Sequence, residues 1–233
     1  MNPLSKPRRR FVLLALLASV GMLHGVNASA LASADAVSGL KEALTRGATQ
    51  AVATLGKPDG FLGNDRVRIP LPEKAQQAEM LLRRLGGGKY VDQLVETINR
   101  AAESAVVEAR PILWQSVKQM SVKDAMSILQ GGDDAATQYF RATTSTTLAA
   151  RVRPLVDAAT RKVGVTRQYE KFAGKASQLG LLDEKDADLD AYITGKTLDG
   201  LFLMIADEEK AIRQDPVGTG SAVLKKVFGA LLK

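Results

Sequence analysis

The stretch that decides the fold is YVDQLVETINRAAESAVVEA, residues 90–109. Its apolar residues recur every three or four positions, as Val91, Leu94, Val95, Ile98, Ala102, Ala105, Val106 and Ala109. This spacing is the period of an α-helix with one apolar face, so the stretch predicts a long amphipathic helix. The same period continues through most of the chain, which therefore predicts an all-α protein.

On the N-terminal side, the same pattern predicts two more helices joined by an irregular segment. One helix is expected over 37–55 and a second over 73–85, which Gly86-Gly87-Gly88 ends. Near residues 60–71, apolar residues alternate with Arg and Pro around a Gly-Asn-Asp turn. This composition favours an extended segment or a small hairpin at the edge of the bundle.

On the C-terminal side, shorter apolar stripes predict a series of helices. Ser121 and Asp124 have the spacing of a capping box, and Asp133 or Asp134 is placed to cap the helix that follows. Pro154 is expected to kink or split its helix. The expected helices cover residues 111–120, 122–129, 135–140, 148–163, 166–179, 186–194, 198–213 and 221–232. Together they predict an irregular multi-helix bundle in one domain, residues 31–233.

Residues 1–30 have the composition of a cleaved signal peptide. Three arginines at 8–10 precede an apolar run at 11–23, and two motifs, Ala28-Ser29-Ala30 and Ala32-Ser33-Ala34, offer a cleavage site. The apolar run has 13 residues, fewer than the roughly 18–20 that span a membrane. We therefore expect cleavage after Ala30 and a periplasmic location. The twin-arginine and general secretory routes both stay open, because Pro7 stands where the twin-arginine signal usually has Ser or Thr.

Composition excludes several classes of function. Removing residues 1–30 takes away four basic residues and no acidic one, so the net charge falls from +7 to +3. With no basic cluster and only 5% aromatic residues, a nucleic-acid partner is not expected. The chain has no Cys, and its one His, His24, lies in the signal. Zinc, copper and haem are therefore not expected, and any chemistry must use carboxylates, hydroxyls, amides, Lys or Arg. The spacing of Asp186, Asp188 and Asp190 begins like a calcium loop, but Ala191 and Thr197 stand where that loop needs Gly and Glu. No cofactor is therefore expected.

Two glutamates suggest sites. Glu209 falls in the middle of the apolar face of 198–213, and burial of a carboxylate requires a partner. The sequence therefore predicts a buried Glu209–Arg213 pair, shared with a polar group of another helix, and a structural role is preferred over a ligand-binding or catalytic one. Glu103-Ser104 resembles the Glu-Ser dipeptide of lytic transglycosylases. The preferred interpretation of Glu103 is an ordinary hydrated helix face, with a Glu96–Arg100 pair beside it.

Residues 221–233 form an amphipathic pattern with three lysines opposite an apolar stripe. Packing of that stripe on the rest of the bundle is the preferred interpretation. Peripheral contact with an anionic membrane is the alternative.

Several short blocks carry a resemblance to a known family. They are DGFL at 59–62, IPLP at 69–72, NRAAE at 99–103, MSVKDA at 120–125, AATxYFR at 135–141, LDGLF at 198–202, EExxIRxxP at 208–216 and KVFG at 226–229. In this order they resemble the bacterial exported proteins grouped as domain of unknown function 4197. The resemblance implies an envelope location and a helical fold, and it brings no activity, cofactor or catalytic residue.

The polar members of these blocks are the candidate site residues: Asn99, Glu103, Asp124, Thr137, Tyr139, Arg141, Glu209 and Arg213. If the helices bring them together, they form one internal or cleft-lining polar network. Such a network either satisfies buried polar groups or lines a ligand pocket, and the sequence leaves both open.

Three hypotheses for function follow. The preferred one is a non-enzymatic periplasmic protein that binds a small ligand or an envelope protein through its helical scaffold. The second is a carboxylate-dependent enzyme acting on cell-wall glycan, with Glu103 or Glu209 as the acid. The third is association with a membrane surface through residues 221–233.

Overall fold

The computed structural model describes residues 23–84, 86–163 and 188–215. These residues form helices joined by turns, and they contain no strand. The all-α prediction is thereby confirmed. The helices are α1 (Leu23–Leu55), α2 (Glu73–Arg84), α3 (Gly88–Val106), α4 (Ala109–Gln119), α5 (Val122–Gln130), α6 (Ala135–Val163) and α9 (Leu189–Gln214).

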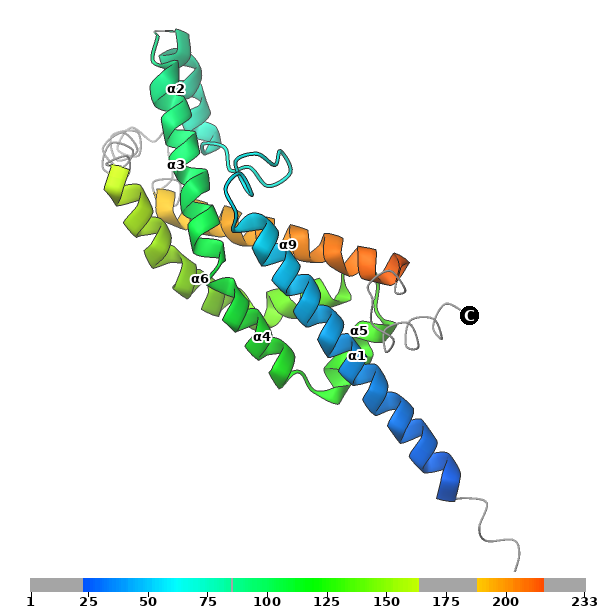
Figure 1. Ribbon diagram of the computed structural model, residues 1–233. Coiled ribbons are helices and arrows are strands. Elements are labelled where there is room, and N and C mark those ends of the chain that lie inside the picture. Colours follow the sequence, from blue (N-terminus) through cyan, green and yellow to red (C-terminus); the bar gives the residue numbers. More distant parts are fainter. Residues whose placement is uncertain (1–22, 85, 164–187, 216–233) are drawn as a thin grey trace, which may run out of the picture.

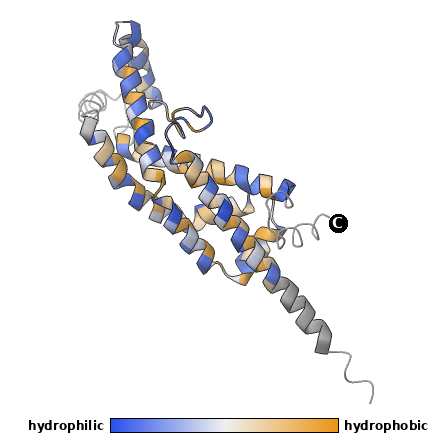
Figure 2. Ribbon diagram, in the orientation of Figure 1, coloured by the Kyte–Doolittle hydropathy of each residue, from blue (hydrophilic) through white to orange (hydrophobic). Residues whose placement is uncertain are grey.

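The core lies where the long helices cross. Helix α6 packs most extensively on α9 and α3, and α1 packs on α9 and α4 (Figure 1). Figure 2 shows apolar residues alternating with polar ones along these helices, as expected of helices with one buried face. The largest fully buried side chains are Phe61, Phe140, Phe202, Leu40, Leu55, Ile69, Ile98, Leu113, Leu148, Leu189, Ile193 and Leu201. Burial of these apolar surfaces is the dominant force that holds the bundle together.

The helix boundaries near α5 follow local rules. Asp124 N–H donates to Ser121 Oγ (3.1 Å), and Ser121 N–H donates to Asp124 Oδ2 (3.0 Å). This reciprocal pair confirms the predicted capping box. The hydrogen bonds from Ser121 also hold the pKa of Asp124 below its ordinary value.

Helices α6 and α9 are each continuous where the sequence predicted breaks. Helix α6 joins the two helices expected over 135–140 and 148–163. Pro154 lies inside α6 and does not split it into two helices. A proline removes the hydrogen bond to the carbonyl four residues earlier. That residue, Ala150, is exposed, so water can satisfy its carbonyl group. In α9, Gly195 has open space around its Cα, and the helix passes through it to join the two helices expected over 186–194 and 198–213.

Residues 56–72 form a series of turns between α1 and α2. Gly60 N–H donates to Lys57 O (2.9 Å), and Val67 N–H donates to Asn64 O (3.0 Å). The extended segment or hairpin predicted near 60–71 therefore has no strand partner. We call residues 56–72 the docked segment, because its apolar side chains, Phe61 above all, are buried against the helices.

Some expectations lie outside the described residues. These are most of the signal peptide and the helices predicted near 166–179 and 221–232. Helix α1 begins at Leu23 and runs through Ala30, so cleavage after Ala30 stays a prediction. Within the described part of the chain, no helix is both long enough and apolar enough to cross a membrane.

Candidate functional site

Glu103 holds the docked segment from the side of α3. Its Oε1 accepts hydrogen bonds from Phe61 N–H (3.1 Å) and Leu62 N–H (3.2 Å), and its Oε2 accepts one from Arg100 Nη1 (2.8 Å). Glu103 is only 4% exposed. The predicted hydrated face is therefore wrong at this position, because the docked segment covers this flank of α3.

Asn99 holds the same segment four residues earlier on α3. Ile69 N–H donates to Asn99 Oδ1 (2.8 Å), and Asn99 Nδ2 donates to Ile69 O (2.9 Å). The second Nδ2 proton reaches Val95 O (2.8 Å). The amide thus satisfies both backbone groups of a buried residue, as a neighbouring strand would.

Small residues allow the segment to approach the helices closely. A Cβ on Gly60 would lie 2.3 Å from Leu55 O, and a Cβ on Gly200 of α9 would lie 2.8 Å from Phe61 Cε1. The ring of Phe61 therefore rests directly on Gly200. Three of the blocks that carry the family resemblance, DGFL, NRAAE and LDGLF, meet at this place.

Arg100 connects the buried Glu103, which holds the docked segment, to the protein surface. Its guanidinium lies 2.8 Å from Glu103 Oε2, 2.9 Å from Asp59 Oδ1 and 3.8 Å from Glu96 Oε1, so the predicted Glu96–Arg100 pair is confirmed. The hydrogen bond to Glu103 raises the pKa of Arg100 above its ordinary value. Asp59 has a positive φ of 63°, a backbone conformation that costs energy in a residue with a side chain.

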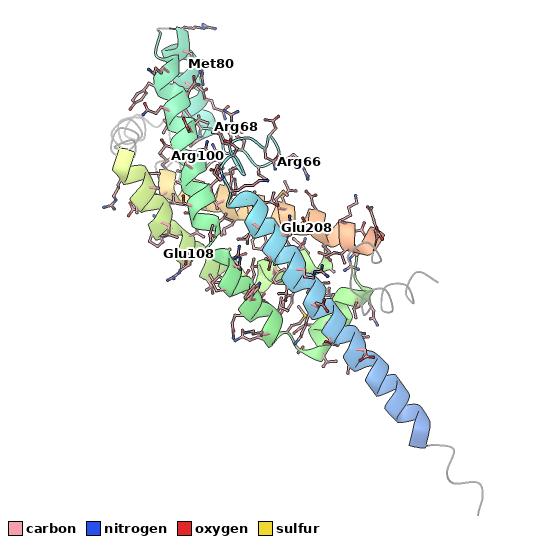
Figure 3. The ribbon with its side chains drawn as sticks, viewed as in Figure 1. Arg66, Arg68, Met80, Arg100, Glu108 and Glu208 are labelled. Atoms are coloured by element: carbon pink, nitrogen blue, oxygen red, sulfur yellow. The ribbon has the colours of Figure 1, made fainter. Side chains whose placement is uncertain are left out.

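A second arginine fixes the far end of the docked segment. Arg66 forms two hydrogen bonds to Asp207 of α9, of 2.5 Å and 3.1 Å. Figure 3 shows Arg66 and Arg68 on the docked segment, with Arg100 on α3 close by. The segment is therefore tied to α3 and α9 by polar contacts, in addition to its buried apolar side chains.

An open hollow of about 360 Å³ lies beside Arg100, between α3 and α6. Its lining combines amide, carboxylate, hydroxyl and guanidinium groups with two alanines: Gln93, Glu96, Thr97, Arg100, Ser104, Ala101 and Ala159. The sequence prediction missed this hollow as a site. Its signal was present as a polar stripe at 93, 96, 97, 100 and 104, which is a helical period. What could not be read from the sequence was the position of Ala159 opposite that stripe.

Glu209 lies in a second, separate polar group. Its Oε1 accepts from Ala136 N–H, and its Oε2 accepts from Thr137 N–H and Thr137 Oγ1, each at 2.9 Å. Arg213 Nη2 lies 2.9 Å from Glu209 Oε1 and also donates to Ile128 O (2.9 Å). The buried Glu209–Arg213 pair, shared with another helix, is thereby confirmed, with Glu209 5% exposed.

The sequence predicted that Asp133 or Asp134 caps the N-terminus of α6, but Glu209 makes these hydrogen bonds instead. Asp134 precedes α6, but its carboxylate accepts a hydrogen bond from Gln138 Nε2 (3.0 Å). The backbone N–H groups of Ala136 and Thr137 go to Glu209 instead. The first turn of α6 is thus capped by a side chain from α9.

The remaining candidate residues make separate contacts. Tyr139 Oη donates to Ser116 O (3.2 Å). The exposed Arg141 lies 4.6 Å above the Phe202 ring and 3.5 Å from Asp199. Asp124 remains at its helix cap. The eight candidates therefore do not form one network: Asn99 with Glu103 and Thr137 with Glu209 and Arg213 are two groups, and the other three stand apart.

The chemistry that these groups can perform is limited by their partners. Every carboxylate oxygen of Glu103 and Glu209 accepts a hydrogen bond, so neither carboxylate presents a free oxygen to a substrate. In the described ranges, no three His, Cys, Asp or Glu side chains gather as a metal site would require. The accessible polar groups of this region are those that line the hollow beside Arg100.

Comparison with known proteins places the chain in one family. Residues 30–229 match the family described as "Protein of unknown function (DUF4197)". Neither the curated proteins nor the solved structures gave a match.

Proposed function

Because the chain belongs to the DUF4197 family of proteins of unknown function, which supplies no activity, we propose a function from its geometry. The protein is an exported, periplasmic, non-enzymatic binding protein. Its hollow beside Arg100 takes a small polar ligand or a polar group of an envelope partner. The observation that carries this proposal is the open hollow of about 360 Å³, lined mostly by polar residues, whose Arg100 is bonded to Glu103 at the docked segment.

The size and lining of the hollow indicate the chemistry of its ligand. Small-molecule sites commonly have volumes of about 300–1,000 Å³. Gln93 and Ser104 can both donate and accept hydrogen bonds. Thr97 Oγ1 donates its proton to Gln93 O (2.8 Å) and can accept one. Arg100 is already paired with three carboxylates, so it does not favour a multiply charged anion. The hollow therefore suits a molecule that carries hydrogen-bond donors and acceptors on a compact frame.

The rigidity of the surroundings also supports binding at this place. Arg100 is fixed by Glu103 and Asp59, and the docked segment is fixed by Asn99 and Glu103. A site whose side chains are already positioned loses less entropy when it binds. Ligand binding to a prearranged hollow is therefore favourable without rearrangement of the bundle.

A titration of the exported protein, followed residue by residue by amide NMR, tests the site. Amino acids, sugars and cell-wall fragments are the first probes. We expect shifts to concentrate on residues 93–104 and Ala159, and to weaken in Thr97→Val and Ser104→Ala. The matched control is Thr146→Val, an exposed threonine of α6 outside the hollow. Binding that is unchanged by the first two variants would contradict the site.

The enzymatic alternative has less support, because Glu103 and Glu209 are buried and saturated with hydrogen-bond donors. Incubation with peptidoglycan tests it directly, since release of soluble fragments would favour it. Membrane association through residues 221–233 lies outside the described residues. Co-sedimentation with anionic liposomes, with and without that segment, tests it.

Export has its own test. We expect the protein in the periplasmic fraction with an N-terminus at Leu31. Replacement of Arg8, Arg9 and Arg10 by Lys discriminates the routes, since the twin-arginine route requires the arginines. A chain that stays in the cytoplasm and begins at Met1 would contradict the proposed location.

A further inference from the structure

Helix α2 projects from the bundle as half of a hairpin. It packs on α3, and none of the other described helices has substantial contact with it. In Figure 1, α2 and the first turns of α3 extend beyond the crossing of α1, α6 and α9. Met80 lies on this hairpin and is 58% exposed (Figure 3). One face of α2 therefore has no cover within the described residues.

Three exposed residues of different chemistry share this face of α2. At about 100° per residue, Glu73, Met80 and Arg84 fall within about 40° of one another on the helix. All three are exposed, while Ala75, on the opposite side, is buried. Among the side chains that the structure describes, the face thus presents a carboxylate at the N-terminal end, a thioether between, and a guanidinium at the C-terminal end. We call these three residues the α2 stripe.

The charges of the α2 stripe are available for an external partner. Neither Glu73 nor Arg84 forms an ion pair with any other residue that the structure describes. The neighbouring Arg83, by contrast, is bound to Glu79 (2.9 Å) and Asp92 (2.7 Å). Arg84 thus has no acidic partner among the described residues, and its guanidinium can meet one from outside the chain.

We propose that a second copy of this chain docks on the α2 stripe, with the two α2 helices antiparallel about a twofold axis. An isologous interface must be complementary to itself, and the stripe is. Antiparallel pairing places Glu73 of each copy against Arg84 of the other, and brings both Met80 side chains beside the axis. Because the two charges of the stripe cancel, it does not favour an anionic membrane as its partner.

The absence of cysteine gives a direct test by cross-linking. Met80→Cys places a single thiol beside the proposed axis, and Val122→Cys places one on α5, where Val122 is 62% exposed. With the full exported chain and a short bis-maleimide linker, we expect Met80→Cys to form a covalent dimer at least about tenfold faster than Val122→Cys. Equal rates would overturn the proposal.

Charge reversal provides an independent test that does not depend on a thiol. Sedimentation equilibrium of the wild-type chain should show a reversible dimer, and Arg84→Glu should weaken it by about tenfold or more. Adding Glu73→Arg should restore it, because the reversed pairs are again complementary. A wild-type monomer at every soluble concentration, or a double variant no tighter than Arg84→Glu alone, would overturn the proposal. Circular dichroism of each variant separates lost docking from lost folding.

Discussion

Glu209 caps the N-terminus of α6 from another helix, with its Oε2 2.9 Å from both the N–H and the Oγ1 of Thr137. One turn along α9, Arg213 donates to Ile128 O in the last turn of α5. A helix N-terminus carries a partial positive charge and a C-terminus a partial negative one. The carboxylate and the guanidinium therefore each face the helix end of opposite sign, and the pair fixes the α5–α6 turn.

Replacement of Glu209 by Ala should destabilise the fold strongly. It removes the buried carboxylate that Arg213 pairs with, and it leaves two N–H groups of α6 without an acceptor. Breaking a buried pair in this way costs about 3–5 kcal/mol. Urea unfolding, monitored by circular dichroism, measures the loss in the free energy of unfolding.

The matched control is Glu42→Ala. Glu42 and Arg46 have the same four-residue spacing, but both side chains are about half exposed and lie 3.9 Å apart. Such a pair is worth about 0.5 kcal/mol or less. The double variant Glu209→Ala with Arg213→Ala should lose less than the sum of the two single changes. Equal losses in Glu209→Ala and Glu42→Ala would show that the buried pair has no special role.

Asn99→Asp should release the docked segment at one point. An aspartate keeps an acceptor for Ile69 N–H but loses the donor to Ile69 O and Val95 O, and it buries a charge. We expect faster hydrogen exchange at the Ile69 amide than in the wild type. The amides of Ala136 and Thr137, at the separate Glu209 group, are the internal control. Acceleration of both groups alike would indicate global unfolding instead.

Two glycines of α9 should respond in opposite directions to alanine. Gly195 has nothing within 4 Å of an added Cβ, so Gly195→Ala should stabilise the helix by up to about 1 kcal/mol. At Gly200 the added Cβ would lie 2.8 Å from Phe61 Cε1 and 3.3 Å from Val67 Cβ. Gly200→Ala should destabilise by about 1–3 kcal/mol through overpacking. Thermal unfolding of the two variants side by side measures the contrast, and a similar shift in both would refute the close contact.

What the sequence predicted correctly was local in the chain. The capping box of Ser121 and Asp124 and the pair of Glu209 and Arg213 each join residues three or four positions apart, where helical spacing alone brings the side chains together. The polar partners of Glu209, in contrast, lie 72 and 73 residues away. That Glu209 must have polar partners could be predicted from the cost of burying a carboxylate. Which groups they are depends on how α6 and α9 pack.

The burial of Glu103 was not predictable from α3 alone. A helical wheel shows which residues share a flank, but not what covers that flank. Here the cover is the docked segment, whose N–H groups are 41 and 42 residues distant. Likewise, the continuity of α6 through Pro154 depends on the exposure of Ala150, which only the packing of the helix determines.

The pH dependence of stability should change in Glu208→Gln. Burial raises the pKa of Glu208 above its ordinary value, and the neighbouring Asp207 adds to this. The folded state therefore holds this proton more tightly than the unfolded state. The resulting stabilisation is present below the ordinary carboxyl pKa of about 4.3 and is lost as the pH rises through the folded value. Above that value, Glu208 destabilises the fold, because its charge is only partly hydrated.

The amide introduced by Glu208→Gln carries no charge, so the variant should unfold at a higher temperature than the wild type at neutral pH. The advantage should disappear at a pH below about 4, where Glu208 is protonated in both states. The exposed Glu42→Gln, measured over the same pH range, controls for loss of a carboxylate from the surface. Thermal unfolding in matched buffers gives the comparison. A variant that is less stable than the wild type at neutral pH would mean that ionised Glu208 stabilises the fold and that its burial is outweighed.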